Sequence, residues 1–282
     1  MPITNQKILF KPAEVARLID RGEAVLIDVR DPEFYREGHI AGAANIPEVF
    51  YYLATTTDEG LAELNRTFTG LFSKAGLTRG KSAIFYEDSL TKRYCGSCRG
   101  VWLARYLGHG DSGILYGGLD AWKSLGNPLE SGDFTPVPAE FIPAPRSELV
   151  ATTEDVVAAM KDPSVILLDD RDEDEWKGES SSPYGIRFAP RMGRIPGARW
   201  IEWRRFLRVS AKYPAFKTPR EITALCAKHG IHPDDDIIIY CFKGARASNT
   251  FIALTLAGFK RLRIYFGSWN EWSRHPELPI EE

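Results

Sequence analysis

The sequence predicts an α/β protein built from two similar domains, each with a mainly parallel sheet flanked by helices. Short apolar strands alternate with amphipathic helices along the chain, which is typical of βαβ units. Four short sequence blocks occur twice, in the same order. A proline-rich stretch separates the two sets of blocks. Together these observations favour a duplicated domain over one large sheet.

The first half begins with a predicted helix at 12–19, because Val15, Leu18 and Ile19 recur at helical spacing and Pro12 suits a first turn. Apolar runs that cover both faces predict strands in a covered sheet. These runs lie at 24–27, 82–86 and 113–116. Helices are expected at 61–75, at 100–107 and from 117 onward.

In the second half, the β-branched run 237–240 follows the acidic turn 234–236 and predicts a buried strand. An apolar pattern typical of a helix starts at Phe251. Between them lies a short loop that contains Cys241. A cysteine at this place would meet backbone N–H groups and the positive end of a helix.

The repeated blocks keep their spacing as well as their order. Gly42 and Tyr86 lie 44 positions apart, and Gly197 and Tyr240 lie 43 apart. This agreement predicts a duplicated domain. The paired blocks are Val25–Arg30 with Ile166–Arg171, Gly38–Ala43 with Gly193–Ala198, Ile84–Tyr86 with Ile238–Tyr240, and Gly117–Trp122 with Gly267–Trp272.

Proline density sets the predicted domain limits. Residues 127–146 contain five prolines, which precludes a regular helix and favours an extended linker. We therefore expect domains at 1–126 and 147–282. Arg30 and Gly38 are 8 positions apart, whereas Arg171 and Gly193 are 22 apart, so the second copy carries an insert around 179–192. This polar insert, which holds Arg187 and Arg191, is a candidate loop over the second site.

Composition narrows the functional classes. The chain has 282 residues, 44% of them apolar, and a net charge of −2, which gives no case for a nucleic acid or a membrane as partner. No apolar run approaches the roughly 18 residues of a membrane helix, and the first residues lack the long apolar region of a signal peptide. Four cysteines are too few for a disulfide framework. We expect a cytoplasmic protein, and no cofactor is expected.

Cys241 is the candidate nucleophile. A lone cysteine is usually a buried core residue, but Lys243 and Arg246 are two cations within five positions and do not fit an apolar pocket. Their charges and the helix end both favour a thiolate. The loop therefore predicts covalent chemistry at the sulfur atom.

These blocks resemble the rhodanese family, in particular its tandem-domain sulfurtransferases. The resemblance rests on the loop Cys241–Arg246, both Asp-x-Arg blocks, the Gly-x-Ile-x-Gly-Ala blocks and Gly267–Trp272. It implies a parallel sheet flanked by helices and an active cysteine in the second copy only. Glu87 aligns with Cys241, so the first copy is expected to be catalytically silent.

The resemblance also implies a two-step sulfur transfer from thiosulfate through a persulfide on Cys241, with release of sulfite and transfer to cyanide or a thiol. It implies a cradle for the persulfide made by the loop. The cradle would comprise Phe242, Gly244 and Ala245, and we expect Lys243, Arg171 and Arg246 to bind the donor. A salt bridge to Asp169 or Glu175 is the alternative role for Arg171, and bracing of the loop is the alternative for Arg246.

Within the resemblance, Cys-Arg-Lys-Gly loops accompany thiosulfate and Cys-Gly-Ser-Gly loops accompany 3-mercaptopyruvate. This chain has Cys-Phe-Lys-Gly, so thiosulfate is favoured, while Phe242 leaves an organic sulfur donor as the alternative. A rhodanese-fold phosphatase is less favoured, because its loop needs seven residues from Cys to Arg and this one has six.

Cys95 and Cys98 form a Cys-x-x-Cys pair close to three cations in the first copy. Such a pair can form a disulfide, relay a persulfide or be two unrelated thiols. No second pair completes a zinc site, so a metal is not expected. The oligomeric state and the role of the 179–192 insert are not determined by these patterns.

Overall fold

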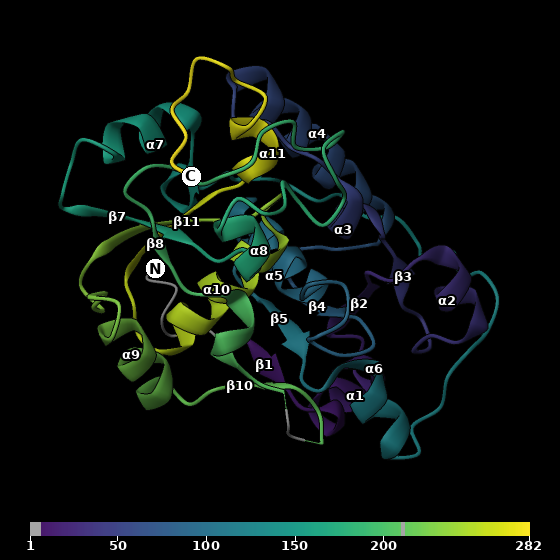
Figure 1. Ribbon diagram of the computed structural model, residues 1–282. Coiled ribbons are helices and arrows are strands. Elements are labelled where there is room, and N and C mark those ends of the chain that lie inside the picture. Colours follow the sequence, from purple (N-terminus) through teal and green to yellow (C-terminus); the bar gives the residue numbers. More distant parts are fainter. Residues whose placement is uncertain (1–6, 210–211) are drawn as a thin grey trace.

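The first domain is a five-stranded parallel sheet with helices on both faces. A computed structural model describes residues 7–209 and 212–282 (Figure 1). The first sheet has the strand order β1-β5-β4-β2-β3. Its elements are β1 (Leu9–Phe10), α1 (Pro12–Asp20), β2 (Ala24–Asp28), α2 (Pro32–Glu37), β3 (Ala44–Asn45), α3 (Glu48–Tyr51), α4 (Asp58–Lys74), β4 (Ser82–Tyr86), α5 (Gly96–Tyr106), β5 (Ser112–Leu115) and α6 (Gly118–Ser124).

The second domain repeats this topology, with the strand order β6-β12-β11-β7-β8 and parallel pairing throughout. A small antiparallel hairpin, β9–β10, is added to it. Its strands and α-helices are β6 (Val150–Ala151), α7 (Thr153–Ala159), β7 (Val165–Asp169), α8 (Glu173–Trp176), β8 (Arg199–Trp200), β9 (Leu207–Arg208), β10 (Ala215–Phe216), α9 (Pro219–Ala227), β11 (Asp236–Tyr240), α10 (Ala245–Leu256), β12 (Arg261–Tyr265) and α11 (Ser268–Trp272). The predicted duplicated α/β fold is confirmed.

The two sheets share their register at the point where each active-site loop begins. Asp28 pairs with Tyr86 in the first sheet, and Asp169 pairs with Tyr240 in the second. In parallel α/β sheets, ligands bind at the carboxyl ends of the strands. The repeat therefore places residue 87 of one domain and residue 241 of the other at equivalent edges.

Helix α10 begins at Ala245, six residues before the predicted start at Phe251. Its first two turns contain Ser248, Asn249 and Thr250, which are polar yet fully buried. Because these residues pack inside the protein without being apolar, the apolar periodicity does not reach the true start of the helix. Arg246 therefore lies on the first turn of a helix instead of in a loop.

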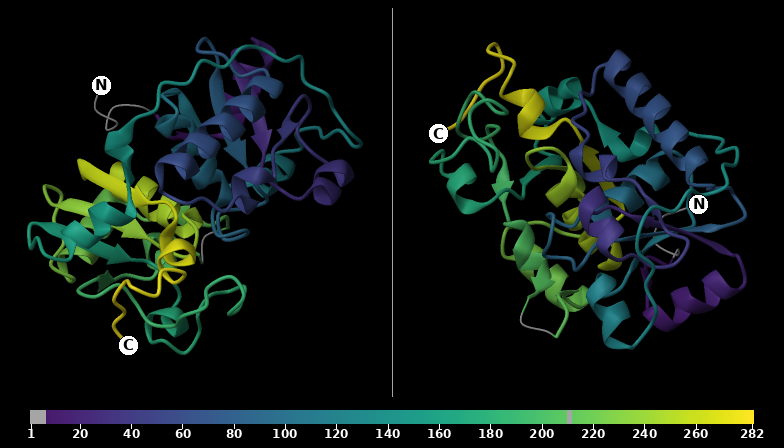
Figure 2. Two further views of the ribbon diagram at one scale, coloured as in Figure 1. Left: turned by 90° about the horizontal axis from the view of Figure 1, so that it is seen from above. Right: turned by 90° about the vertical axis from the view of Figure 1, so that its right-hand side faces the viewer.

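The two domains lie side by side, and α5 of the first packs against α10 of the second (Figure 2). Trp102 on α5 stacks on Phe266 of the second domain at 4.4 Å between ring centroids. Cys95 also contacts Asn249 across this boundary, with Sγ 3.2 Å from Oδ1. The interface thus runs directly beside the loop that carries Cys241.

Residues 127–146 contain no helix or strand segment and run along the first domain (Figure 2). Glu130 pairs with His39, and the backbone N–H groups of Ala139 and Ala144 donate to the carbonyls of Ser73 and Leu107. Domain limits at 126 and 147 remain a prediction. Among the helices of the described residues, none is long and apolar enough to cross a membrane.

Candidate active site

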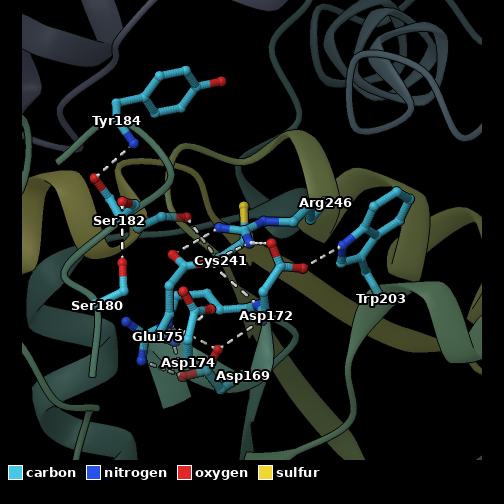
Figure 3. A network of polar contacts seen from close by, with 12 residues as sticks. Asp169, Asp172, Asp174, Glu175, Ser180, Ser182, Tyr184, Trp203, Cys241 and Arg246 are labelled. Carbon is cyan, nitrogen blue, oxygen red and sulfur yellow. Dashed lines mark hydrogen bonds and ion pairs between the residues drawn. The ribbon is translucent and has the colours of Figure 1, made fainter. Parts of the chain in front are cut away.

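Cys241 lies directly after β11, at the amino end of α10, where the sequence places the nucleophile (Figure 3). The N–H of Gly244 donates to the Cys241 sulfur at 3.1 Å. The backbone N–H groups of Ala247 and Lys243 also lower the pKa of the thiol. A cluster of amides at a helix start is a site that stabilises negative charge.

The loop has its shape because Gly244 is a glycine. Its φ is +86°, and a Cβ at this position would lie 2.7 Å from the Phe266 ring. A side chain here would be strained and would also collide with that ring. Gly244 therefore allows the turn that aims the amides at the sulfur.

The repeated block Gly267–Trp272 forms three hydrogen bonds with the nucleophile loop. The backbone N–H groups of Trp269 and Asn270 donate to the carbonyls of Cys241 and Phe242 at 3.0 and 2.9 Å. The hydroxyl of Ser268 accepts the N–H of Cys241 at 3.2 Å. These three bonds explain why this block belongs to the same site as the loop.

The protonation of Cys241 differs from the sequence-based expectation of a thiolate. Its side chain is 1% exposed, and burial raises the pKa of the thiol. Asp170 acts in the same direction, whereas Arg246 acts against it. In this closed arrangement the loss of solvation outweighs the nearby positive charge.

Lys243 lies beside the nucleophile in an aromatic surrounding. Its Nζ is 4.0 Å from the centroid of the Phe50 ring and 4.9 Å from that of Tyr184, with Tyr51 also close. Within residues 7–209 and 212–282 no carboxylate forms an ion pair with it. Burial and the charge of Arg99 lower the pKa of Lys243 to about 7, so its amine titrates near neutral pH.

Arg246 is a brace and not an unpaired cation. Its guanidinium pairs with Glu175, with Nη2 2.9 Å from Oε1, and with Asp172 at 3.1 Å. The pair is buried, and it ties the first turn of α10 to α8 (Figure 3). The two carboxylates neutralise much of the positive charge that the sequence suggests for binding a donor.

Arg171 does not reach the cavity. Its side chain is fully buried, pairs with Asp169 at 2.6 Å, and donates to the Gly193 carbonyl at 2.9 Å. The guanidinium also stacks on the Trp269 ring at 4.5 Å. These contacts join β7 to the loop before β8 and agree with the alternative role, a salt bridge to Asp169. Binding of the donor by Arg171 stays a prediction.

The cavity beside Cys241 is small, at about 10 Å³, which is roughly the room for one water-sized group. Pro183 and Tyr184 of the insert form part of its wall, so the insert lies over the second site. The far end of the insert is anchored by Arg191, which donates to the carbonyls of Trp272, Ser273, His275 and Leu278. The cavity is lined by Tyr94, Pro183, Tyr184, Cys241, Phe242, Lys243, Ala245 and Arg246.

The first domain keeps the same site architecture without the nucleophile. The Glu87 carbonyl accepts the N–H of Leu119 at 2.9 Å, as the Cys241 carbonyl accepts that of Trp269. The Glu87 carboxyl accepts the Ser97 hydroxyl at 2.7 Å at the start of α5. Burial raises the pKa of Glu87 to about 8. A neutral carboxyl group thus lies where the second domain has its sulfur.

The other cysteines lie in surroundings that do not favour reactivity. Cys95, Cys98 and Cys226 are fully buried, and burial raises the pKa of each thiol. The Cys95 thiol donates to the carbonyl of Leu90 at 2.6 Å. In the described part of the chain, no group of three or more metal-binding side chains is present.

Sequence reasoning missed the residues that the first domain contributes. Phe50 and Tyr94 line the surroundings of Lys243 and Cys241 from 147 or more positions away in the chain. Only the length of the insert signalled that Tyr184 belongs to the site. No local pattern connects the α3 region with the nucleophile loop, because the contact exists only when the domains pack.

Comparison with known proteins agrees with this architecture. The model of the rhodanese-like domain matches residues 11–125 and 152–275. The chain is 26% identical to a thiosulfate sulfurtransferase of Azotobacter vinelandii, over 97% of each chain. It is 28% identical to a 3-mercaptopyruvate sulfurtransferase of Escherichia coli, over 95% of each. 

A solved structure with the same fold is the anaerobic ergothioneine biosynthesis enzyme from Chlorobium limicola in complex with trimethyl histidine. The TM-score is 0.82 at 22% identity, over 97% of this chain and 69% of that one. At this identity the likeness concerns the fold alone. The matches of the domain model cover most of the chain, and they fall on the two sheets described above. The chain therefore belongs to the rhodanese family, as a tandem of two rhodanese-like domains.

Proposed function

We propose that the chain is a thiosulfate sulfurtransferase that works through a persulfide on Cys241. The observation that carries the proposal is the Cys241 sulfur itself, which receives the Gly244 N–H at the start of α10 and faces a cavity of about 10 Å³. A space of that size accommodates little more than one atom. An anionic sulfur bound to Cys241 suits both the space and the amides around it.

The reaction balances in two steps. The thiol proton leaves to solvent, and the thiolate attacks the outer sulfur of thiosulfate. The bond from that sulfur to the sulfite group breaks, sulfite leaves with the electron pair, and Cys241 carries a persulfide. Cyanide or a thiol then attacks the terminal sulfur, which restores the Cys241 thiolate. The proposed roles are covalent catalysis for Cys241, donor binding for protonated Lys243, and persulfide cradling for Phe242, Gly244 and Ala245.

Two features support 3-mercaptopyruvate as the second candidate donor. Aromatic side chains of Tyr94, Tyr184 and Phe242 make much of the cavity wall, which suits an organic donor. Two paired carboxylates leave Arg246 with little charge for a dianion such as thiosulfate. Thiosulfate stays the first candidate because Lys243 has no carboxylate partner among the described residues.

Intact-protein mass spectrometry after incubation with each donor tests the proposal. With thiosulfate, we expect the wild type to gain one sulfur atom, cyanide to remove it, and Cys241→Ser to gain none. A gain with 3-mercaptopyruvate alone would move the donor to the second candidate. No gain with either donor would refute the persulfide mechanism.

A further inference from the structure

Arg99 is a buried cation that belongs to the first domain yet lies next to the second domain's site. It is on α5 and is fully buried. Its guanidinium donates to the carbonyls of Val49 at 3.0 Å, Phe50 at 2.9 Å and Tyr52 at 2.7 Å. In the described residues no carboxylate pairs with it. A buried charge without a counterion is costly, so its position calls for a functional reason.

The contacts of Arg99 lead to the nucleophile loop along two routes. Its Cζ lies 4.6 Å from the centroid of the Phe266 ring, and that ring packs against the backbone of Gly244. On the other side, Arg99 holds the carbonyl of Phe50, whose ring lies 4.0 Å from the Lys243 Nζ. One aromatic ring thus separates the guanidinium from the loop on each route. The interior between them holds no bulk water to screen the charge.

The other charged groups around Cys241 do not supply a permanent positive charge. Arg246 is paired with two carboxylates. Burial raises the pKa of Asp170 well above its usual range, and a carboxyl group supplies no positive charge in either protonation state. Burial also raises the pKa of Tyr184 to about 12. Lys243 loses its proton near pH 7. The titratable groups around the sulfur are Tyr94, Asp170, Tyr184, Lys243 and Arg246, with Asp172 and Glu175 behind Arg246 and Arg99 beyond the two aromatic rings.

We propose that Arg99 is a positioning residue of the first domain that stabilises the anionic sulfur on Cys241 across the domain boundary. A guanidinium is suited to this task because it remains charged where a buried lysine becomes neutral. Burial lowers the pKa of Arg99 only to about 10. The domain without a nucleophile therefore supplies the constant cation, and it also aligns the aromatic wall around Lys243. This role of Arg99 depends on the proposed function, because the anionic sulfur that it stabilises is that of the Cys241 thiolate and persulfide.

The test is the pH dependence of Cys241 alkylation by iodoacetamide, followed at the level of the Cys241 peptide by mass spectrometry. Arg99→Gln removes the charge and keeps an amide donor for the α3 carbonyls. Because the charge of Arg99 also lowers the pKa of Lys243, Arg99→Gln is compared with its parent in a Lys243→Met background, where that response is absent. There we expect the midpoint of the pH profile to rise by about one unit, which is about a tenfold slower reaction at a fixed pH below the midpoint. Arg99→Met serves as a second neutral variant if Arg99→Gln does not fold.

Arg105 provides a matched control on the same helix. It is also buried, its pKa is also lowered to about 10, and it bonds Ser112 away from the site. Arg105→Gln should lose comparable stability in urea and leave the alkylation midpoint in place. An unchanged midpoint in the Arg99 variants, or an equal shift in Arg105→Gln, would overturn the proposal. Because alkylation needs no sulfur donor, this result is independent of whether Cys241 accepts sulfur from thiosulfate.

Discussion

Replacing Lys243 with methionine tests whether its amine binds the donor as a cation. Methionine fills a similar volume without a charge. Removing one fixed group aimed at developing charge costs about 100-fold or more in rate, so we expect kcat/KM for thiosulfate to fall by about 100-fold at pH 6. At that pH nearly all of a lysine with a pKa of about 7 is protonated.

The defect should shrink as the pH rises. At pH 8 only about one-tenth of the wild-type lysine carries its proton, so the wild type loses most of the advantage that the variant lacks. The expected ratio of wild type to Lys243→Met is therefore about 10-fold at pH 8. The Cys241 thiolate raises the pKa of Lys243, so the two titrations are coupled. The pH profile of Cys241 alkylation is therefore measured in both proteins, and its contribution is divided out of the ratio.

Steady-state kinetics with cyanide as acceptor, from pH 6 to pH 8, measure this ratio. For a two-step reaction with a covalent intermediate, kcat/KM for thiosulfate reports the first step alone. Lys260→Met is the control, because Lys260 is exposed and pairs with Asp234 at the opposite end of β12. A ratio that stays constant across this range, or grows with pH, would show that Lys243 is not the titrating cation.

Three further changes test the surroundings of the sulfur. Tyr184→Ala removes a ring from the cavity wall, so iodoacetamide should alkylate Cys241 about fivefold faster, since one aromatic contact contributes about 1 kcal/mol; an unchanged rate would show that another group limits access. Arg171→Met leaves Asp169 buried without its partner, so unfolding in urea should show a loss of about 3–5 kcal/mol; a raised KM for thiosulfate at full stability would support Arg171 as a donor ligand. Burial raises the pKa of Glu87 to about 8, so the folded state keeps a proton that the unfolded chain releases above about pH 4.5. Stability should then fall as the pH rises from about 4.5 to about 8, and Glu87 contributes up to about 1.4 kcal/mol per pH unit to this slope. Glu87→Gln should reduce the slope by that contribution; the same slope in both proteins would contradict the assignment.

Local sequence patterns predicted the repeated strands, most of the helices and the place of the nucleophile. These features depend on neighbours within a few positions: β-branched runs, helical periodicity, and a cysteine between a strand and a helix. The start of α10 was predicted too late, because Ser248, Asn249 and Thr250 are buried against the rest of the protein without being apolar. The burial of these polar residues thus interrupts the apolar periodicity that would otherwise mark the start of α10.

The least reliable sequence-based inference concerned the free positive charge near Cys241. Donor binding was expected for Arg246 and Arg171, with bracing of the loop and a salt bridge to Asp169 or Glu175 as the alternatives; the structure has Arg246 paired with Asp172 and Glu175 and Arg171 paired with Asp169. Sequence spacing does not show which acid meets which base, since a pair such as Arg246 and Glu175 spans 71 positions. Arg99, from the other domain, is an arginine near the loop that has no carboxylate partner among the described residues.

The sequence by itself determined the duplicated α/β fold and the position of Cys241, because both follow from short-range patterns and their repetition. Tertiary structure decided the protonation of the thiol, the place of Tyr184 in the cavity wall and the charge balance around the sulfur. The solvation of the thiol and the ion pairing of the charged side chains around it depend on groups that both domains contribute. They exist only once α5 and α10 have packed against each other.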